Sequence, residues 1–339
     1  MKNLPDNHPI LPKPKIGVLI INLGTPEATD YFSMRKYLNE FLSDKRVIEI
    51  PSVLWQPILN FFILTFRPKK SGKLYDKIWD KNKNESPLKT TTREQKEKLK
   101  LVYKEENVKI EWAMRYGKPS IFEKMNILTN QGCNKILIFP LYPQYSASTT
   151  ASVMDKVNDF MYKKRWQPTI RTVPPYYDSP IYINSLIKSI KKHIKKLTWV
   201  PDTLICSFHG IPKKYFMKGD PYHCQCVKTQ RLIKEQLKKE FNNVDYCFQS
   251  RFGPQEWLQP YMIDKFKELI KNNQKKICVI TPGFASDCLE TLEEIKIQSE
   301  EEFLECGGEK FSYIPCLNST DISINMLDEI IKKELKGWI

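Results

Sequence analysis

Short apolar runs that end in turn residues recur along the chain and predict buried strands. Residues 15–23 read KIGVLIINL and are followed by Gly24-Thr25-Pro26, and residues 203–208 are followed, after His209, by Gly210-Ile211-Pro212. Runs that stay apolar at nearly every position are typical of strands buried on both faces of a parallel sheet. Because segments with helical periodicity lie between them, the pattern predicts an α/β fold.

Three sequence marks occur twice in the same order and indicate an internal repeat. The first is the strand followed by Gly-x-Pro. The second is a strand-like run closed by Arg-aromatic-Gly, at residues 115–117 and 251–253, and the third is an apolar run that ends in Pro140 or Pro282 before small residues. We therefore predict two similar doubly wound lobes with a ligand between them, at the carboxyl ends of the strands.

The composition is that of an ordinary globular protein, and its charge narrows the choice of partners. The chain has 339 residues, more than one average core holds, and 41% of them are apolar. Its formal net charge of +15 admits nucleic acid, an anionic membrane surface or an acidic ligand. Much of the excess is lysine in runs that resemble solvated helix faces, and no nucleic-acid-binding motif accompanies it. We expect no nucleic-acid partner.

Cysteine usage and the first thirty residues indicate an intracellular protein. Nine cysteines occur without a secretory signal pattern ahead of them, so free thiols in a reducing cytosolic compartment are the simpler interpretation. No stretch of 18 apolar residues exists, and we therefore expect no membrane-spanning helix.

An apolar segment in the first half is the main departure from the repeat. About 50 more residues separate the first two marks in the first half than in the second, and they include residues 51–70, PSVLWQPILNFFILTFRPKK. Its apolar part, residues 53–66, is too short to span a bilayer. The cations that follow it are Arg67, Lys69, Lys70 and Lys73. An apolar wedge rimmed by cations suits an anionic membrane interface. The alternative is a buried helix over a ligand cavity, and a lid whose outer side touches lipid would satisfy both.

His209 is the first candidate for chemistry. It stands at the carboxyl end of a predicted strand, where α/β proteins place ligands, and histidine accepts and donates protons near neutral pH. The alternative is a structural histidine, but Gly210 allows close backbone approach and Pro212 fixes the exit of the chain. The equivalent place in the first half, around Leu23, holds no histidine, as expected for an asymmetric site.

An acidic stripe follows the last repeated mark. Asp287, Glu290 and Glu294 are three and four positions apart, so a continuous helix would place them on one face. A solvated face is the simple interpretation. Because the stripe begins at a strand end that faces the same crevice as His209, its carboxylates are also candidates for passing a divalent cation along oxygen ligands.

Two further segments carry polar chemistry. Residues 140–150, PLYPQYSASTT, place hydroxyls and free backbone N–H groups at a strand-to-helix turn, where they can bind anionic ligand oxygens. Capping of the helix by Ser146 or Ser148 is the alternative. His223-Cys224-Gln225-Cys226 lacks the second cysteine pair of a zinc-finger spacing, so we expect no structural metal there.

Taken together, five segments resemble the ferrochelatase family: INLGTP, PLYPQYSASTT, SFHGIP with GDPYHC after it, FQSRFGP and SDCLETLEEI. The resemblance runs from about Lys15 to Leu317. It implies the chelatase fold, with two Rossmann-like lobes, parallel four-stranded sheets flanked by helices and a porphyrin cleft between them. The lobes would comprise residues 14–172 plus 315–339, with a hydrophobic lip at about 51–70, and residues 173–314.

The activity that the resemblance implies is insertion of Fe²⁺ into protoporphyrin IX to give protohaem, the final step of haem biosynthesis. It assigns catalysis to His209 and Glu290, and the path of the metal to these two residues with Asp287 and Glu294. The substrate-binding residues that it implies are Leu23, Arg67, Ser86, Arg115, Tyr116, Tyr142, Tyr145, Ser146, Ser148, Trp257 and Phe284.

The resemblance also implies the partners and the location. Fe²⁺ enters as substrate and no cofactor stays bound. The chain ends at KGWI without the cysteine-rich tail that carries a [2Fe–2S] cluster in some members, so we expect no cluster. We expect a cytoplasmic protein that touches the inner face of the cell membrane through residues 51–70, with the preceding porphyrinogen oxidase as a further candidate contact.

The chain departs from the family at two positions, and rival functions stay open. Cys288 stands where some members have histidine, and Gln298 stands where the acidic ladder often continues. The rivals are a chelatase for coproporphyrin III or another tetrapyrrole, and a two-lobed haem-binding module without turnover.

Overall fold

Two parallel four-stranded sheets form the centre of the computed structural model, which describes residues 7, 14–104, 107–241, 243–251 and 253–339. The first sheet has the order β2-β1-β3-β4, and the second has the order β6-β5-β7-β8. The strands of the first are β1 (Lys15–Gly24), β2 (Val108–Tyr116), β3 (Cys133–Pro140) and β4 (Thr169–Thr172). Those of the second are β5 (Thr203–His209), β6 (Asn243–Gln249), β7 (Lys276–Ile280) and β8 (Lys310–Ile314). The same strand order in both sheets confirms the predicted repeat.

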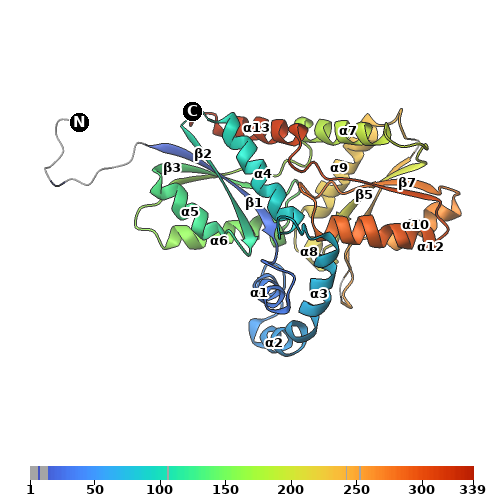
Figure 1. Cartoon of the computed structure of the whole chain (residues 1–339), viewed down its shortest axis with the longest axis horizontal. Helices are drawn as coiled ribbons and strands as arrows, with labels where there is room; N and C mark the ends of the chain where they lie inside the picture. Colours follow the sequence, from blue (N-terminus) through green and yellow to red (C-terminus); the bar gives the residue numbers. More distant parts are fainter. Residues whose placement is uncertain (1–6, 8–13, 105–106, 242, 252) are drawn as a thin grey trace.

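Helices flank both sheets (Figure 1). The first half contains α1 (Tyr31–Leu42), α2 (Ser52–Ile58), the π-helical segment η1 (Leu59–Ile63), α3 (Leu64–Ile78), α4 (Pro87–Val102), α5 (Ile121–Asn130), η2 (Ala147–Ala151) and α6 (Ser152–Tyr162). The second half contains α7 (Pro180–Ile194), α8 (Lys213–Met217), α9 (Tyr222–Gln236), α10 (Met262–Lys271), α11 (Leu289–Thr291), η3 (Leu292–Ser299), α12 (Glu300–Glu305) and α13 (Asp321–Leu335).

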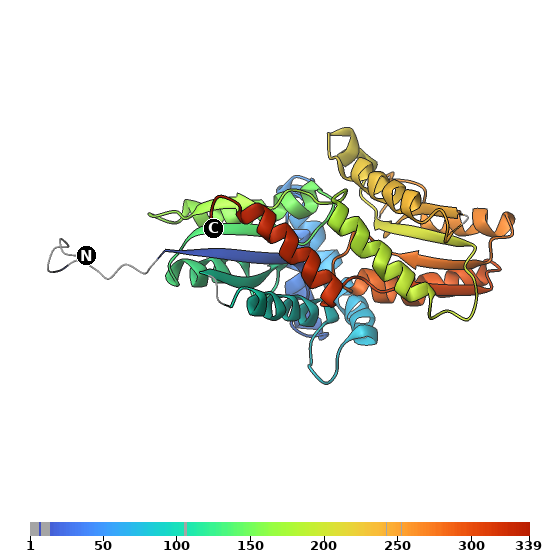
Figure 2. The same ribbon diagram turned by 90° about the horizontal axis from the view of Figure 1, so that it is seen from above.

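One apolar core runs through both sheets. Val18 of β1, Phe139 of β3 and Phe208 of β5 belong to the same contiguous cluster of buried side chains. Helices α7 and α13 pack against each other along one side of the molecule, and α13 also packs on α4 (Figure 1 and Figure 2). The last helix of the chain therefore ties the first sheet to the second.

The end of β1 shows why the first strand closes with a glycine. Gly24 has a φ of 122°, and a Cβ atom there would lie 1.9 Å from the carbonyl oxygen of Tyr116. No other residue type fits this approach of two neighbouring strands. The turn therefore fixes where the chain leaves the carboxyl end of the first sheet.

Residues 51–70, which we call the lip, extend away from both sheets together with α1 (Figure 1). The inner side is buried, since Trp55 and Leu59 pack against α1 and the indole N–H of Trp55 donates to the carbonyl oxygen of Leu42 at 2.7 Å. The outer side exposes six large apolar side chains, those of Val53, Leu54, Ile58, Phe61, Phe62 and Phe66. The lip is thus neither a fully buried helix nor a fully solvated one. No helix in the described ranges has the length and apolarity needed to cross a membrane.

Candidate active site

His209 ends β5 with its ring half-buried. Its Nδ1 atom lies 2.6 Å from the carbonyl oxygen of Gly210. Because a carbonyl oxygen only accepts hydrogen bonds, Nδ1 carries the proton of this contact. In the neutral ring the lone pair is then on Nε2, which makes that atom the proton acceptor of the site.

Gly210 keeps the turn after His209 tight. A Cβ atom at this position would lie 2.8 Å from the carbonyl oxygen of Gln249 and 3.2 Å from the indole ring of Trp257. Close approach of backbone and ring, rather than a left-handed backbone, is therefore what requires glycine here. The same contact places Trp257 beside the strand end that carries His209.

Gln249 connects the histidine strand to the acidic segment. It is the neighbour of His209 across the sheet, and it is buried. Its Nε2 atom donates to the carbonyl oxygen of Glu290 at 2.7 Å and to Oε2 of Glu294 at 3.3 Å. The hydroxyl of Ser250 donates to the same Glu294 oxygen at 2.6 Å. Gln249 and Ser250 thus bring Glu290 and Glu294 to the strand end of His209.

Gln249 and Ser250 were not predicted as site residues, although both lie in the segment FQSRFGP. Ser250 has a φ of 65°, a left-handed conformation that few non-glycine residues adopt. Such backbone outliers cluster at functional sites. A conformational outlier is invisible in a sequence, but the position directly after the second repeated strand was a usable signal.

Glu294 shows that the acidic segment and the histidine act on one another. Burial raises the pKa of Glu294, the hydrogen bond from Ser250 and the charge of His209 oppose that rise, and the charge of Glu290 adds to it. His209, Glu290 and Glu294 therefore form one electrostatic group. A carboxyl whose pKa is shifted by burial and by neighbouring charges is typical of catalytic sites.

The pKa of Glu294 yields a testable stability change. In the folded protein the carboxyl keeps its proton to higher pH than in the unfolded chain, so its cost to stability appears as pH rises through the folded pKa and is absent below the unfolded one. We expect Glu294→Gln to raise the melting temperature relative to the wild type, by a margin that grows as pH rises above the usual pKa of a glutamate carboxyl. Exposed Glu301→Gln is the control, and a margin independent of pH would contradict this account.

The prediction that Asp287 shares a helix face with the two glutamates is wrong. Asp287 precedes α11, which begins at Leu289, so it does not share a helix face with Glu290 and Glu294. Its carboxylate is buried and accepts four hydrogen bonds, from the Tyr313 hydroxyl at 2.6 Å, the Asn318 amide at 2.7 Å, the Thr291 hydroxyl at 3.1 Å and the Cys316 N–H at 3.3 Å. With its oxygens so engaged, Asp287 anchors the segment that leads to Glu290.

Cys224 and Cys226, which are two positions apart in the chain, lie in different environments. Cys226 is buried in the core, where burial raises the pKa of its thiol, whereas Cys224 is exposed. Over the part of the chain that the structure describes, no three His, Cys, Asp or Glu side chains are grouped so that they could hold a metal ion.

Two tyrosines from the first half lie near Glu290 and were not predicted. Tyr37 and Tyr75 are buried, and their rings contact each other edge to face with centroids 6.5 Å apart. Burial raises the pKa of Tyr75, and the nearby charge of Glu290 raises it further; burial and the charges of Tyr75 and Glu290 do the same for Tyr37. Leu23 and Leu289 pack against the same apolar cluster. The acidic segment thus meets both halves of the molecule.

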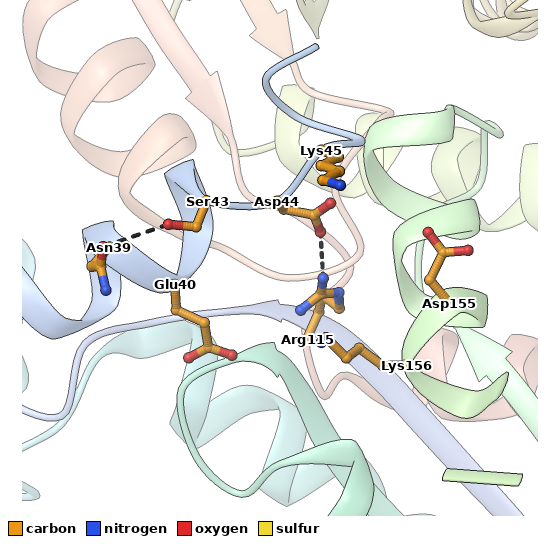
Figure 3. A pocket seen from close by; sticks show the side chains of 8 residues that line it. All are labelled: Asn39, Glu40, Ser43, Asp44, Lys45, Arg115, Asp155 and Lys156. Atoms are coloured by element: carbon orange, nitrogen blue, oxygen red, sulfur yellow. Dashed lines mark hydrogen bonds and ion pairs between the residues drawn. The ribbon is translucent and has the colours of Figure 1, made fainter. Parts of the chain in front are cut away.

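Arg115 forms a buried ion pair in the first half. Its guanidinium binds the carboxylate of Asp44, and its Nε atom donates to the hydroxyl of Ser152 at 2.6 Å. The hydroxyl of Tyr116 donates to Asp44 at 2.8 Å. Burial works to raise the pKa of Asp44, but the hydrogen bond from Ser152, that from the Arg46 backbone and the charge of Arg115 hold it below its usual value. A pocket of about 410 Å³ opens beside this pair (Figure 3).

The turn at residues 140–150 joins the two halves. Ser146 caps η2, and its hydroxyl donates to the carboxylate of Asp220 at 2.9 Å; the hydroxyls of Ser146 and Ser148 lie 3.0 Å apart. The N–H of Tyr145 donates to the side chain of Gln225 at 2.7 Å. The capping alternative therefore holds for Ser146, and these contacts set the spacing of the lobes.

Tyr142 lies in the same turn and differs from its neighbours. Its hydroxyl oxygen is buried without a hydrogen-bond partner among the described residues. Burial raises the pKa of this hydroxyl, and the charges of Tyr116, Arg115 and Tyr37 act on it, so Tyr142 lies near the arginine pair and near Tyr37. A buried hydroxyl without a partner is costly, and a ligand atom would remove that cost.

The remaining predicted substrate residues are dispersed. Arg67 is half-buried at the start of α3, where burial lowers the pKa of its guanidinium. Ser86 is buried and caps α4, accepting the N–H of Lys89 at 3.3 Å. Phe284 is half-buried and packs on the core at the start of the segment that leads to Glu290. Phe284 thus lies on the core ahead of the acidic segment, and Ser86 has a capping role.

Comparison with known proteins gives full-length matches. The sequence model of the family described as Ferrochelatase matches residues 15–335. A ferrochelatase of Agrobacterium fabrum (strain C58 / ATCC 33970) is 54% identical over 337 residues, which are 99% of this chain and 98% of that protein. A ferrochelatase of Rhizobium meliloti (strain 1021) is 52% identical over 333 residues, 98% of each chain.

Solved structures show the same fold at low sequence identity. SirB from Bacillus subtilis with Fe³⁺ superposes with a TM-score of 0.56 at 12% identity, covering 94% of this chain and 95% of that one. CbiX, described as the terminal enzyme for biosynthesis of siroheme in denitrifying bacteria, gives a TM-score of 0.50 at 12% identity, covering 94% and 98%. These likenesses support the chelatase fold, and the full-length matches show that the chain belongs to the ferrochelatase family.

Proposed function

We propose that the protein inserts Fe²⁺ into protoporphyrin IX to give protohaem, the final step of haem biosynthesis. Membership of the ferrochelatase family makes it a lyase that inserts metal into a porphyrin. The observation that carries the proposed chemistry is the group formed by His209, Glu290 and Glu294, in which a ring nitrogen able to accept protons lies with two carboxylates at the carboxyl end of a sheet.

The reaction has two physical obstacles. Two pyrrole N–H protons must leave the macrocycle, and the flat ring blocks entry of a hydrated ion. A cleft that bends the ring exposes the nitrogen lone pairs, so binding energy is used to favour a distorted geometry. Fe²⁺ then replaces two protons, and the product carries no net charge at its centre.

In our proposal His209 accepts the pyrrole protons through Nε2, the ring atom left free by the contact of Nδ1 with Gly210. Glu290 and Glu294 lead away protons or guide Fe²⁺, and burial of Glu294, which raises its pKa, suits it to hold a proton in transit. Tyr142 would contact the macrocycle with its unpartnered hydroxyl. Arg67 at the end of the lip is the candidate for a propionate.

The lip supports a membrane-associated location. We place the protein in the cytoplasm with the exposed apolar side of residues 53–66 in the inner face of the cell membrane. Exposed Lys69, Lys70 and Lys73 follow on α3 and would meet anionic headgroups. A lip at the membrane surface favours the lipophilic protoporphyrin IX over coproporphyrin III, and it would let the macrocycle arrive from the preceding porphyrinogen oxidase.

The lip proposal predicts a change in lipid binding. Phe61→Ser combined with Phe62→Ser should weaken binding to anionic liposomes by about tenfold or more, because a fully inserted phenylalanine contributes about 1.5–3 kcal/mol. Co-sedimentation with vesicles that contain phosphatidylglycerol measures it. Tyr162→Ser, at an exposed aromatic of α6 away from the lip, is the matched control. If the lip variant and the control bind these vesicles equally well, the lip does not contact the membrane.

A metal-insertion assay on the purified protein tests the proposed activity. The fluorescence of protoporphyrin IX and coproporphyrin III is followed after addition of Zn²⁺, and absorbance after anaerobic addition of Fe²⁺. We expect turnover with both metals and faster turnover with protoporphyrin IX. Faster turnover with coproporphyrin III would move the assignment to that substrate. Tight porphyrin binding without any insertion would favour the haem-binding module instead.

A further inference from the structure

Glu293 is a buried carboxylate that the proposed chemistry does not use. It lies on η3 directly before Glu294 and is only 5% exposed. A charged group in such a place is costly unless a partner of opposite charge binds it. Its partner is Lys77, whose Nζ atom lies 2.8 Å from Oε1 of Glu293. This hydrogen bond and the opposite charge raise the pKa of Lys77.

The Lys77–Glu293 pair joins the two halves of the molecule. Lys77 stands in the last turn of α3, the helix that begins in the lip, and α3 packs against both α11 and η3. Leu289 of α11 adds an apolar contact to the cluster that contains Tyr75 of α3. The acidic segment is thus held by the first half through Lys77 and by the second half through Gln249 and Ser250.

We propose that Lys77 is a positioning residue, whose ion pair with Glu293 fixes the rotation of η3 so that Glu290 and Glu294 face His209. This inference rests on the proposed function. Without Lys77, the carboxylate of Glu293 would be buried without a partner of opposite charge, which is costly. A rotation of η3 that exposes this carboxylate to water would remove the cost. Because Glu294 is the next residue, such a turn carries it away from Ser250 and Gln249.

The kinetic test compares Lys77→Gln with Lys81→Gln, a substitution of an exposed lysine just beyond the end of α3. We expect Lys77→Gln to lower kcat for Zn²⁺ insertion by about tenfold or more, with the dissociation constant for protoporphyrin IX within about twofold of the wild type. Lys77→Arg should keep most of kcat. An unchanged kcat, or a loss confined to KM, would overturn the proposal.

A double variant separates an unpaired charge from a lost contact. If the buried charge of Glu293 drives the rotation, Lys77→Gln combined with Glu293→Gln should recover kcat relative to Lys77→Gln alone. If the loss of kcat in the double variant equals the sum of the losses in Lys77→Gln and in Glu293→Gln, the ion pair has no role, since neither residue then acts through the other.

A measurement without turnover distinguishes failure of this inference from failure of the proposed function. Amide hydrogen exchange of residues 289–299 should be faster in Lys77→Gln than in the wild type, and unchanged in Lys81→Gln. If exchange responds but the wild type inserts no metal, the proposed function fails while the positioning role stands. If the wild type is active and exchange in this segment is unchanged, the positioning role is wrong.

Discussion

Replacing His209 by alanine is expected to lower the rate of metal insertion by about a thousandfold while protoporphyrin IX still binds. The ring supplies a proton-accepting nitrogen at this strand end, because its Nδ1 is bound to the carbonyl oxygen of Gly210 and Nε2 is the remaining ring nitrogen. Alanine removes that acceptor without disturbing the strand, whose pairing depends on backbone bonds to β6. Single-turnover Zn²⁺ insertion measures the rate, and quenching of protein fluorescence measures porphyrin binding.

His193→Ala is the matched control for His209→Ala. His193 lies on α7, where its Nε2 atom contacts the hydroxyl of Ser312 at 2.8 Å, outside the group that contains Glu290. This variant should keep near-normal turnover. Near-normal turnover of His209→Ala as well would remove the histidine from the mechanism, and loss of porphyrin binding would reduce it to a substrate-binding role.

Glu290→Gln is expected to have the second-largest effect, a loss of about a hundredfold or more in kcat with porphyrin binding retained. The change removes the charge but keeps the size of the side chain and the backbone carbonyl that accepts the Gln249 amide. Steady-state kinetics with Zn²⁺ and Fe²⁺ measure the loss for each metal. Exposed Glu301→Gln controls for the loss of one negative charge near the segment.

The pattern of losses for Glu290→Gln separates its two candidate roles. A carboxylate that guides the metal should raise the KM for the metal, whereas one that leads away protons should lower kcat and move its pH dependence. Turnover equal to that of Glu301→Gln would place Glu290 outside the chemistry altogether.

The sheets could be predicted from the sequence because the information is local. Strands such as β1, β3, β5 and β7 are apolar runs closed by turn residues. The repeated marks fall at equivalent strands of the two sheets, such as β1 and β5. The contact between Gly24 and Tyr116 explains why the first mark contains glycine. The extent of the lobes, by contrast, stays a prediction, since the apolar core runs through both of them.

The residues of the candidate site could be predicted where a sequence motif marks the end of a strand. They could not be predicted where packing between distant segments determines which side chains meet. The spacing of Asp287 and Glu290 indicated a shared helix face, but the helix begins only at Leu289, so the rule for helical neighbours does not apply to Asp287. Tyr75 and Lys77 reach the acidic segment from more than two hundred residues away in the chain. The periodicity of a single sequence reports only on neighbours within one helix or strand, so it could not predict this contact between distant segments.

The lip likewise has features that the sequence predicts and features that only packing determines. Its apolar character and its cations are visible in the sequence. Which side chains face outward is set by packing on α1, where Trp55 and Leu59 turn inward while Phe61 and Phe62 stay exposed. The sequence therefore predicts a membrane-facing segment and the two phenylalanines that test it, and in the structure both side chains are exposed.

A crystal structure of the protein with metal-free protoporphyrin IX tests the central claim most directly. Our account predicts the macrocycle at the carboxyl end of β5, with a pyrrole nitrogen within about 3 Å of His209 Nε2 and the Glu290 carboxylate facing the ring. A macrocycle bound elsewhere, for example in the pocket beside Arg115 or on the outer side of the lip, with His209 and Glu290 both out of reach of it, would contradict the account.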